Sequence, residues 1–357
     1  MRSPIFLLAA LSLTAPAFGS SVTFTCDPSI GADFKPGGSS TAVCDYLNNT
    51  IAPEYANTFN NANANVYIAA TNQGLADSTT GFFNLVTYSA YQTALQSQST
   101  DPAKAFVPAT EPGIFGGDSV DLTSALAQAL GITTALTNGG SIEGLTAGGS
   151  ACTTYATPGS GCYNGIIQVN DPTHLKSQTN GQGYTYRTLG GSTNGTTSNY
   201  DFFGVVEHEL DEVLGTSSCI STQGDVLSNS QNCAAAVDLF RYTSSGTRTF
   251  DTIGATAYFS PDVGVTDYQG NTYNNQANGR DWADFSNSCT FVQDAQGCPN
   301  GATFDVLTDG IGGTVGPEIA ILNAVGYDLA TPEPGTLGML GFGFTALGFI
   351  ALRRRRF

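Results

Sequence analysis

The sequence predicts an α+β fold, and three observations lead to that class. Segments with apolar residues at helical spacing are interspersed with short runs of β-type residues along the chain. The two kinds of segment do not follow the regular strand–helix–strand rhythm of a parallel α/β sheet. The chain also shows no internal repeat. Helices and strands are therefore expected in irregular order around one mixed sheet.

The first half of the chain alternates predicted helices with predicted strands. In order, the pattern gives a helix over 45–59, a strand over 66–70, helices over 88–96 and 121–130, and a strand over 162–170. Asp121 is the expected N-cap of the fourth element, and Gly131 is its expected end.

The strongest helical pattern covers residues 201–214. Asp201 is a natural N-cap, and Gly215 is a typical residue just beyond a helix end. Around it, residues 180–198 are rich in Gly, Thr and Asn and are expected to be a loop. Further strands are expected over 237–242 and 257–260, and a last helix over 317–325.

The N-terminus is typical of a secretory signal peptide. Arg2 precedes a nine-residue apolar run over 5–13, and Ala17 and Gly19 are small residues suited to cleavage after residue 19. The expected exporting machinery is the Sec translocon.

The C-terminus has three parts: a Pro332-Glu333-Pro334 motif, an apolar stretch over 336–352, and four consecutive arginines, Arg353, Arg354, Arg355 and Arg356. Seventeen residues of helix are close to the length that spans a bilayer, and terminal arginines stay on the cytoplasmic side. This tail resembles the PEP-CTERM sorting signal of Gram-negative bacteria. The resemblance implies an exosortase partner, initial anchoring in the inner membrane, and a location in the periplasm, at the cell surface or in the extracellular matrix.

These ends divide the chain into a signal peptide (1–19), an exported body (20–330, with parts of about 20–216 and 217–330) and a sorting segment (331–357). Without the two end segments, basic residues fall from 12 to 7 and acidic residues from 29 to 28, which leaves a formal charge of −21 on the body. So acidic a body argues against nucleic-acid binding.

All eight cysteines lie in the body, in four sequence-local pairs. An even count in an exported protein indicates disulfides. We expect nearest-neighbour pairing, although eight cysteines allow 105 connectivities: Cys26–Cys44, Cys152–Cys162, Cys219–Cys233 and Cys289–Cys298.

The predicted helix over 201–214 carries the candidate chemistry, because residues 207–215 read EHELDEVLG. In the zinc-protease pattern H-E-x-x-H, the first and fifth residues bind one Zn²⁺ from the same helix face. The second residue is the general base that activates water. Here His208 and Glu212 take the ligand positions, and Glu209 takes the position of the base.

Several flanking segments extend this resemblance. They are 200–203, 238–242, 257–260, 281–282 and 321–328. With Gly215 seven residues after the histidine, they resemble predicted secreted bacterial metalloproteases of metzincin-like zincin fold. The resemblance implies a mixed twisted sheet, an active-site helix and a smaller C-terminal subdomain.

Two departures from the metzincin pattern leave the third ligand open. Ser218 stands where the third histidine is expected, and the body contains no methionine for a methionine turn. The candidates are Ser218, His174, which is the only other histidine, and an acidic side chain that the sequence does not single out. A carboxylate at position 212 is an accepted zinc ligand and also suits Mn²⁺. Ca²⁺ binding near Asp262 is a weaker alternative to ordinary turns.

The sequence therefore supports two functions. The first is an exported metalloendopeptidase that acts on polypeptides with Zn²⁺ or Mn²⁺. The second is a non-catalytic surface or exopolysaccharide-matrix protein that retains the zincin scaffold. A third side chain that completes the metal site would favour the peptidase, and the sequence does not assign that side chain.

Overall fold

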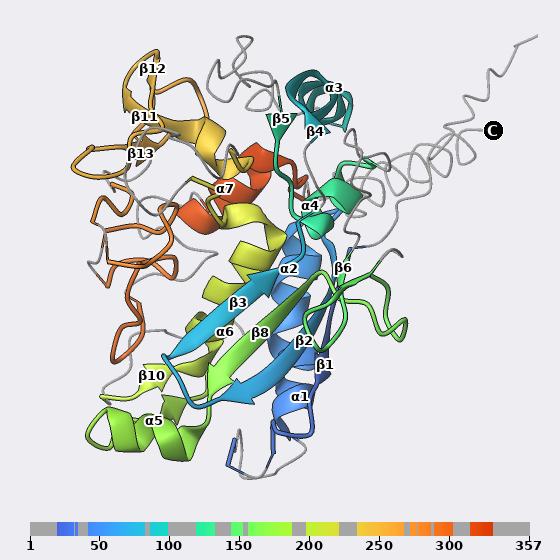
Figure 1. Cartoon of the computed structure of the whole chain (residues 1–357), viewed down its shortest axis with the longest axis vertical. Helices are drawn as coiled ribbons and strands as arrows, with labels where there is room; N and C mark the ends of the chain where they lie inside the picture. Colours follow the sequence, from blue (N-terminus) through green and yellow to red (C-terminus); the bar gives the residue numbers. More distant parts are fainter. Residues whose placement is uncertain are drawn as a thin grey trace, which may run out of the picture.

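A mixed four-stranded sheet lies at the centre of the molecule (Figure 1). The computed structural model describes residues 20–31, 33–34, 42–82, 86–98, 119–132, 144–152, 156–187, 198–220, 234–267, 272–276, 278–286, 289–302 and 315–330. Across the sheet the strand order is β1 (Ser21–Cys26), β2 (Asn63–Thr71), β8 (Gly165–Asn170) and β3 (Ala76–Thr80). The first three are parallel, and β3 runs antiparallel to β8 at the edge. The class is α+β, as predicted.

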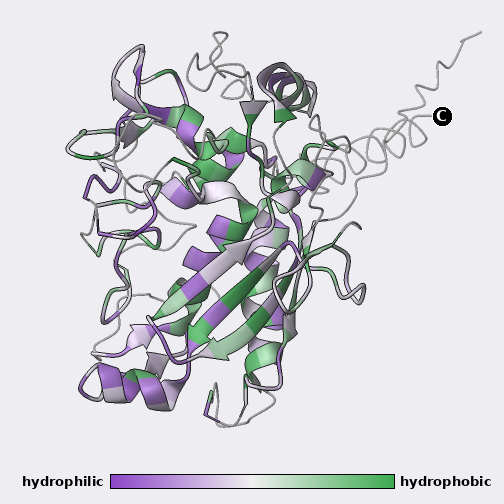
Figure 2. Cartoon of the chain, viewed as in Figure 1, coloured by the Kyte–Doolittle hydropathy of each residue, from purple (hydrophilic) through white to green (hydrophobic). Residues whose placement is uncertain are grey.

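Two helical segments pack on the same face of this sheet, behind it in Figure 1. One is the continuous run α1 (Ala42–Tyr46), η2 (Leu47–Ile51) and α2 (Ala52–Thr58). The other is α6 (Phe202–Asp211) with its π-helical extension η4 (Glu212–Thr216). Strands β2 and β8 are mostly hydrophobic (Figure 2) because both are central strands, and their buried side chains join the core.

A glycine allows α6 and its extension to approach β8 closely. A Cβ atom at Gly165 would overlap the side chain of Val213. Gly215 then ends the helix with a φ of 143°, a conformation that L-residues rarely adopt. The carbonyl of Leu214 accepts hydrogen bonds from Thr123 Oγ1 (3.1 Å) and the Tyr327 hydroxyl (2.8 Å), so the helix end is held by both partners.

The remaining elements surround this layered centre. Towards the upper end of Figure 1 lie β4 (Val86–Thr87), α3 (Tyr88–Gln98), β5 (Ser119–Val120), α4 (Ser124–Ala129) and α7 (Pro317–Val325). A small sheet comprises β12 (Thr247–Arg248), β11 (Arg241–Ser244) and β13 (Tyr258–Phe259), which follow the 3₁₀ turn η5 (Val237–Phe240). Shorter elements are β6 (Gly144–Leu145), β7 (Ala151–Cys152), α5 (Pro172–Gln178), β9 (Tyr184–Thr185) and β10 (Tyr200–Asp201).

Most predicted helices and strands are confirmed, but the N-cap predicted for one helix is wrong. The helices predicted over 45–59, 88–96, 201–214 and 317–325 and the strands over 66–70, 162–170 and 257–260 all have counterparts. The helix predicted over 121–130 starts later, because Thr123 is its N-cap and accepts a hydrogen bond from Leu126 N. Asp121 instead forms a β-bridge with Ala235.

Two local predictions fail because side chains and neighbouring strands override the pattern. The strand predicted over 237–242 begins as η5, since the Asp238 carboxylate accepts hydrogen bonds from the backbone N–H groups of Ala235 and Cys219. The loop predicted over 180–198 contains β9, which pairs in parallel with β10. Residues 188–197 of that loop lie outside the described residues.

Three of the four predicted disulfides are present: Cys26–Cys44, Cys152–Cys162 and Cys289–Cys298. Cys219 is also disulfide-bonded. Its predicted partner, Cys233, lies outside the described residues, as do the signal peptide and the sorting segment. Among the described residues, no helix has the length and apolar character needed to cross a membrane. The stretch 336–352 is not among them.

Candidate metal centre

Helix α6 is fixed at its N-terminal end by a cap and by aromatic packing. The Asp201 carboxylate accepts hydrogen bonds from the backbone N–H groups of Phe203 and Gly204, as the sequence predicted for an N-cap. The Phe202 ring lies 5.2 Å from that of Tyr184 and 5.0 Å from that of Tyr186, centroid to centroid. These contacts prevent the helix from rotating about its axis.

A buried ion-pair network strengthens the same end of α6. Arg187 Nε lies 2.9 Å from Asp201 Oδ2, and Arg187 Nη2 lies 2.8 Å from Glu207 Oε2. The guanidinium also stacks 3.6 Å above the Phe203 ring. Glu207, which precedes the candidate histidine, therefore pairs with Arg187 and takes no part in the candidate site.

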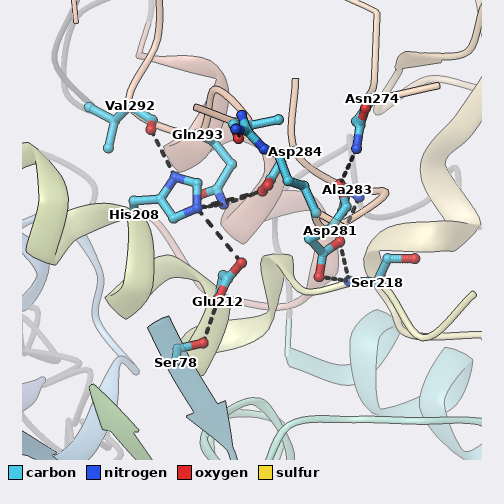
Figure 3. Close-up of polar contacts among 12 residues, drawn as sticks. Ser78, His208, Glu212, Ser218, Asn274, Asp281, Ala283, Asp284, Val292 and Gln293 are labelled. Carbon is cyan, nitrogen blue, oxygen red and sulfur yellow. Dashed lines mark hydrogen bonds and ion pairs between the residues drawn. The ribbon is translucent and has the colours of Figure 1, made fainter. Parts of the chain in front are cut away.

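Three side chains converge beside the middle of this helix and form what we term the candidate ligand group: His208, Glu212 and Asp284. One potential ligand atom from each lies within 4.8 Å of the other two. His208 Nε2 lies 3.7 Å from Glu212 Oε1 and 3.7 Å from Asp284 Oδ1 (Figure 3). One imidazole nitrogen and two carboxylates form an acceptable donor set for Zn²⁺ or Mn²⁺.

Hydrogen bonds orient all three side chains, two of them at the atom facing away from the group and one at the candidate ligand atom itself. His208 Nδ1 donates to the carbonyl of Val292 (3.0 Å), which leaves the Nε2 lone pair facing the two carboxylates. Ser78 Oγ on β3 donates to Glu212 Oε2 (2.5 Å). Gln293 Nε2 donates to Asp284 Oδ1 (3.0 Å). Partners of this kind are typical of metal-binding histidines and carboxylates.

The site concentrates negative charge in a mostly buried place. Burial, followed by repulsion from Glu212, raises the pKa of Glu209 well above its ordinary value, and it does the same to Asp284. Burial also raises the pKa of Asp281, which lies near Asp284. Burial alone would lower the pKa of His208, but Glu209 and Glu212 outweigh it and raise that pKa. A bound divalent cation would relieve the repulsion among these carboxylates.

A cavity of about 600 Å³ opens onto this group. Helix α6 lines it with His208 and Glu209, and its extension η4 lines it with Glu212. The edge strand β3 lines it with Ala76, Asp77, Ser78 and Thr80. The opposite wall is made by segments 279–284 and 291–298. The motif on α6 therefore faces a space that a substrate can enter.

The two sequence candidates for the third ligand lie elsewhere or point away. Ser218 lines the cavity, but its hydroxyl donates to Asp238 Oδ1 at 2.6 Å, and its N–H donates to Asp281. His174 lies on α5, its side chain is 53% exposed, and Nδ1 is 3.8 Å from Asp171 Oδ1. The structure brings neither into the candidate ligand group.

Asp284 is the site residue that sequence reasoning missed. It lies 72 residues after Glu212, on an irregular segment with no ligand-type spacing. The one available signal was the neighbouring Asp281-Trp282, part of the metalloprotease resemblance. Trp282 is buried, and it holds this segment against the core.

Two further polar side chains have structural roles. The guanidinium of Arg241 donates to the Trp282 carbonyl (2.5 Å) and lies 4.5 Å from the centre of the Tyr273 ring. The Asp262 carboxylate accepts hydrogen bonds from Ser260 Oγ and from Thr266 N and Oγ1, which is the pattern of a closed turn.

Comparison with known proteins identifies the C-terminal segment. Residues 330–356 match the PEP-CTERM protein-sorting motif. No curated protein and no solved structure matches the chain. The motif is that of an exported, cell-envelope-associated protein that an exosortase sorts.

Proposed function

We propose that the exported body is a metal-dependent peptidase of zincin-like architecture. The observation that carries this proposal is the convergence of His208, Glu212 and Asp284 beside Glu209 at the floor of a cavity. The mixed sheet with an antiparallel edge strand next to the motif-bearing helix supports the predicted zincin-like fold.

The chain's own residues have distinct roles in this proposal. His208, Glu212 and Asp284 would hold the cation, and a zinc or manganese ion there would polarise a peptide carbonyl and acidify water. Glu209 is buried, lines the cavity and adjoins His208 on α6. It is therefore placed to accept a proton from water and return it to the leaving amine.

The edge strand β3 favours a polypeptide substrate. Within the described sheet β3 pairs only with β8, and its residues line the cavity. An extended peptide can hydrogen-bond along such an edge while its side chains alternate between the cavity and solvent.

The decisive experiment combines metal content with peptide hydrolysis. We expect the exported protein to hold about one equivalent of metal and to cleave members of a peptide library. Glu209→Gln should keep the metal and lose activity by about 10²- to 10⁴-fold, because it removes only the general base. Asp251→Asn, which neutralises an exposed carboxylate outside the cavity lining, is the matched control and should remain active.

Two results would contradict the proposal. A folded wild-type protein without bound metal would show that the candidate ligand group is not a metal site. Metal-loaded protein that cleaves no peptide would instead favour the surface or matrix protein on a zincin-like scaffold.

Attachment and release form a second part of the proposal. The stretch 336–352 would hold the newly exported chain in the inner membrane with its arginines on the cytoplasmic side. The exosortase would then cut near the PEP-CTERM motif and free the enzyme for the envelope or the surrounding matrix.

A further inference from the structure

The carboxamide of Gln293 lies beside two members of the candidate ligand group. Gln293 is fully buried, at 0% exposure. Its Nε2 lies 3.0 Å from Asp284 Oδ1 and 3.5 Å from His208 Nε2 (Figure 3). The amide therefore faces two of the three candidate ligand atoms.

The other end of the same amide is unsatisfied. Gln293 Oε1 is buried and has no hydrogen-bond partner among the described residues. A buried carbonyl oxygen without a partner is rare, since it loses its water and gains nothing in return. Oxygen and nitrogen of a carboxamide have nearly the same size, so half a turn about the last side-chain bond exchanges them at little steric cost.

The backbone at this position is held from two sides. Gln293 N–H donates to Glu318 Oε1 on α7 (3.0 Å), and the preceding carbonyl of Val292 accepts from His208 Nδ1 (3.0 Å). The Cys289–Cys298 disulfide closes the short loop that contains both residues. Only the carboxamide needs to turn.

We infer that Gln293 is a fourth protein ligand of the metal, and that its carboxamide turns to present Oε1 when a divalent cation binds. This inference rests on the metal site of the proposed function. Neutral His208 and two carboxylates carry a charge of about −2, which balances a divalent cation. The amide oxygen adds a donor without adding charge, and it extends the set towards the oxygen-rich coordination that suits Mn²⁺ as well as Zn²⁺.

A simpler role for Gln293 makes a different prediction. If its N–H only orients Asp284, then both Gln293→Met and Gln293→Glu remove that donor and weaken metal binding. If Oε1 is a ligand, Gln293→Glu keeps an oxygen at the same reach, and only Gln293→Met removes it.

The test is a competition titration of Zn²⁺, and separately of Mn²⁺, on the exported protein with its disulfides intact. We expect Gln293→Met to weaken metal affinity by more than about tenfold, the cost of losing even a supporting partner, and Gln293→Glu, which keeps an oxygen donor and adds a negative charge, to bind at least as tightly as the wild type. Gln296→Met, a glutamine lining the same cavity outside the group, is the matched control and should bind like the wild type.

The inference is overturned if both Gln293 variants weaken metal affinity equally, or if neither variant weakens it. The metal site itself stands in either case. Wild-type protein that binds neither metal overturns the proposed function as well. Should Gln293→Met not fold, a crystal structure of zinc-loaded wild type decides the point. Gln293 Oε1 at bonding distance from the ion supports the fourth ligand, and a carboxamide whose Nε2 still donates to Asp284 without touching the ion contradicts it.

Discussion

His208 and Asp284 are 76 residues apart in the chain, yet their side chains meet at 3.7 Å. Glu212, the other partner of His208, is brought to the same helix face by the i and i+4 spacing. On the other side, Asp284 stands on an irregular segment between buried Trp282 and Phe285. The pairing of His208 with Glu212 therefore follows from local helix geometry. The contact of His208 with Asp284 depends wholly on the tertiary fold.

Asp284→Asn tests the contribution of this long-range partner. The substitution preserves shape but removes a charged oxygen donor, so we expect metal affinity to fall by more than about tenfold, the minimum cost for groups that merely support a ligand. The measurement is the same competition titration, with Asp251→Asn, at an exposed position outside the cavity lining, as control. Unchanged affinity in Asp284→Asn would show that the third ligand lies elsewhere.

Helix α6 is the element on which the site depends. Its N-terminal end is capped by Asp201 and anchored by Arg187, and its C-terminal carbonyl at Leu214 is bound by Thr123 and Tyr327. The extension η4 begins at Glu212, and the helical backbone ends at Gly215, whose φ is 143°. Glu212 therefore lies in the last turn before the chain leaves the helix.

Arg187→Met tests how much this anchoring contributes to the whole fold. Arg187 and its partners Asp201 and Glu207 have side chains at most 7% exposed, so the substitution leaves two buried carboxylates without their cation. We expect the free energy of unfolding to fall by about 3–5 kcal/mol in denaturant titrations. Lys176→Met, at an exposed position on α5, should change it by less than about 0.5 kcal/mol. Similar small changes in both variants would contradict the anchoring role.

For the whole molecule, the core links the parts of the body on both sides of residue 216. One cluster of buried residues runs from Val22 on β1 to Tyr327 near the end of the body. The cavity likewise has one wall from β3 and α6 and another from residues beyond 278. The candidate site therefore depends on contact between segments that are distant in the sequence.

Sorting is a property of the whole exported chain, and the matched motif makes it testable. Replacing Pro332, Glu333 and Pro334 together with alanine should abolish exosortase processing, so that the unprocessed chain accumulates in the membrane fraction. Mass spectrometry of membrane and secreted fractions measures this, with Thr331→Ala as the neighbouring control. Normal processing of the triple variant would show that the motif does not direct sorting in this protein.

The sequence by itself determined the features that depend on short-range patterns. Helix α6 with its Asp201 cap, helix α7 over 317–325, and the sequence-local disulfides follow from apolar periodicity, capping chemistry and neighbouring cysteines. The sorting motif is likewise a linear signal that is read without folding. The pairing of His208 with Glu212 belongs to this group, because helical geometry sets it.

Only the tertiary structure decided the features that arise where distant segments meet. Thr123, not Asp121, is the N-cap of α4, because Asp121 forms a β-bridge with Ala235. Ser218 does not join the candidate ligand group, because its hydroxyl donates a hydrogen bond to Asp238. Asp284 and Gln293 entered the site because core packing brings their irregular segments against α6. No spacing rule describes such contacts, since their positions follow from the burial of side chains throughout the chain.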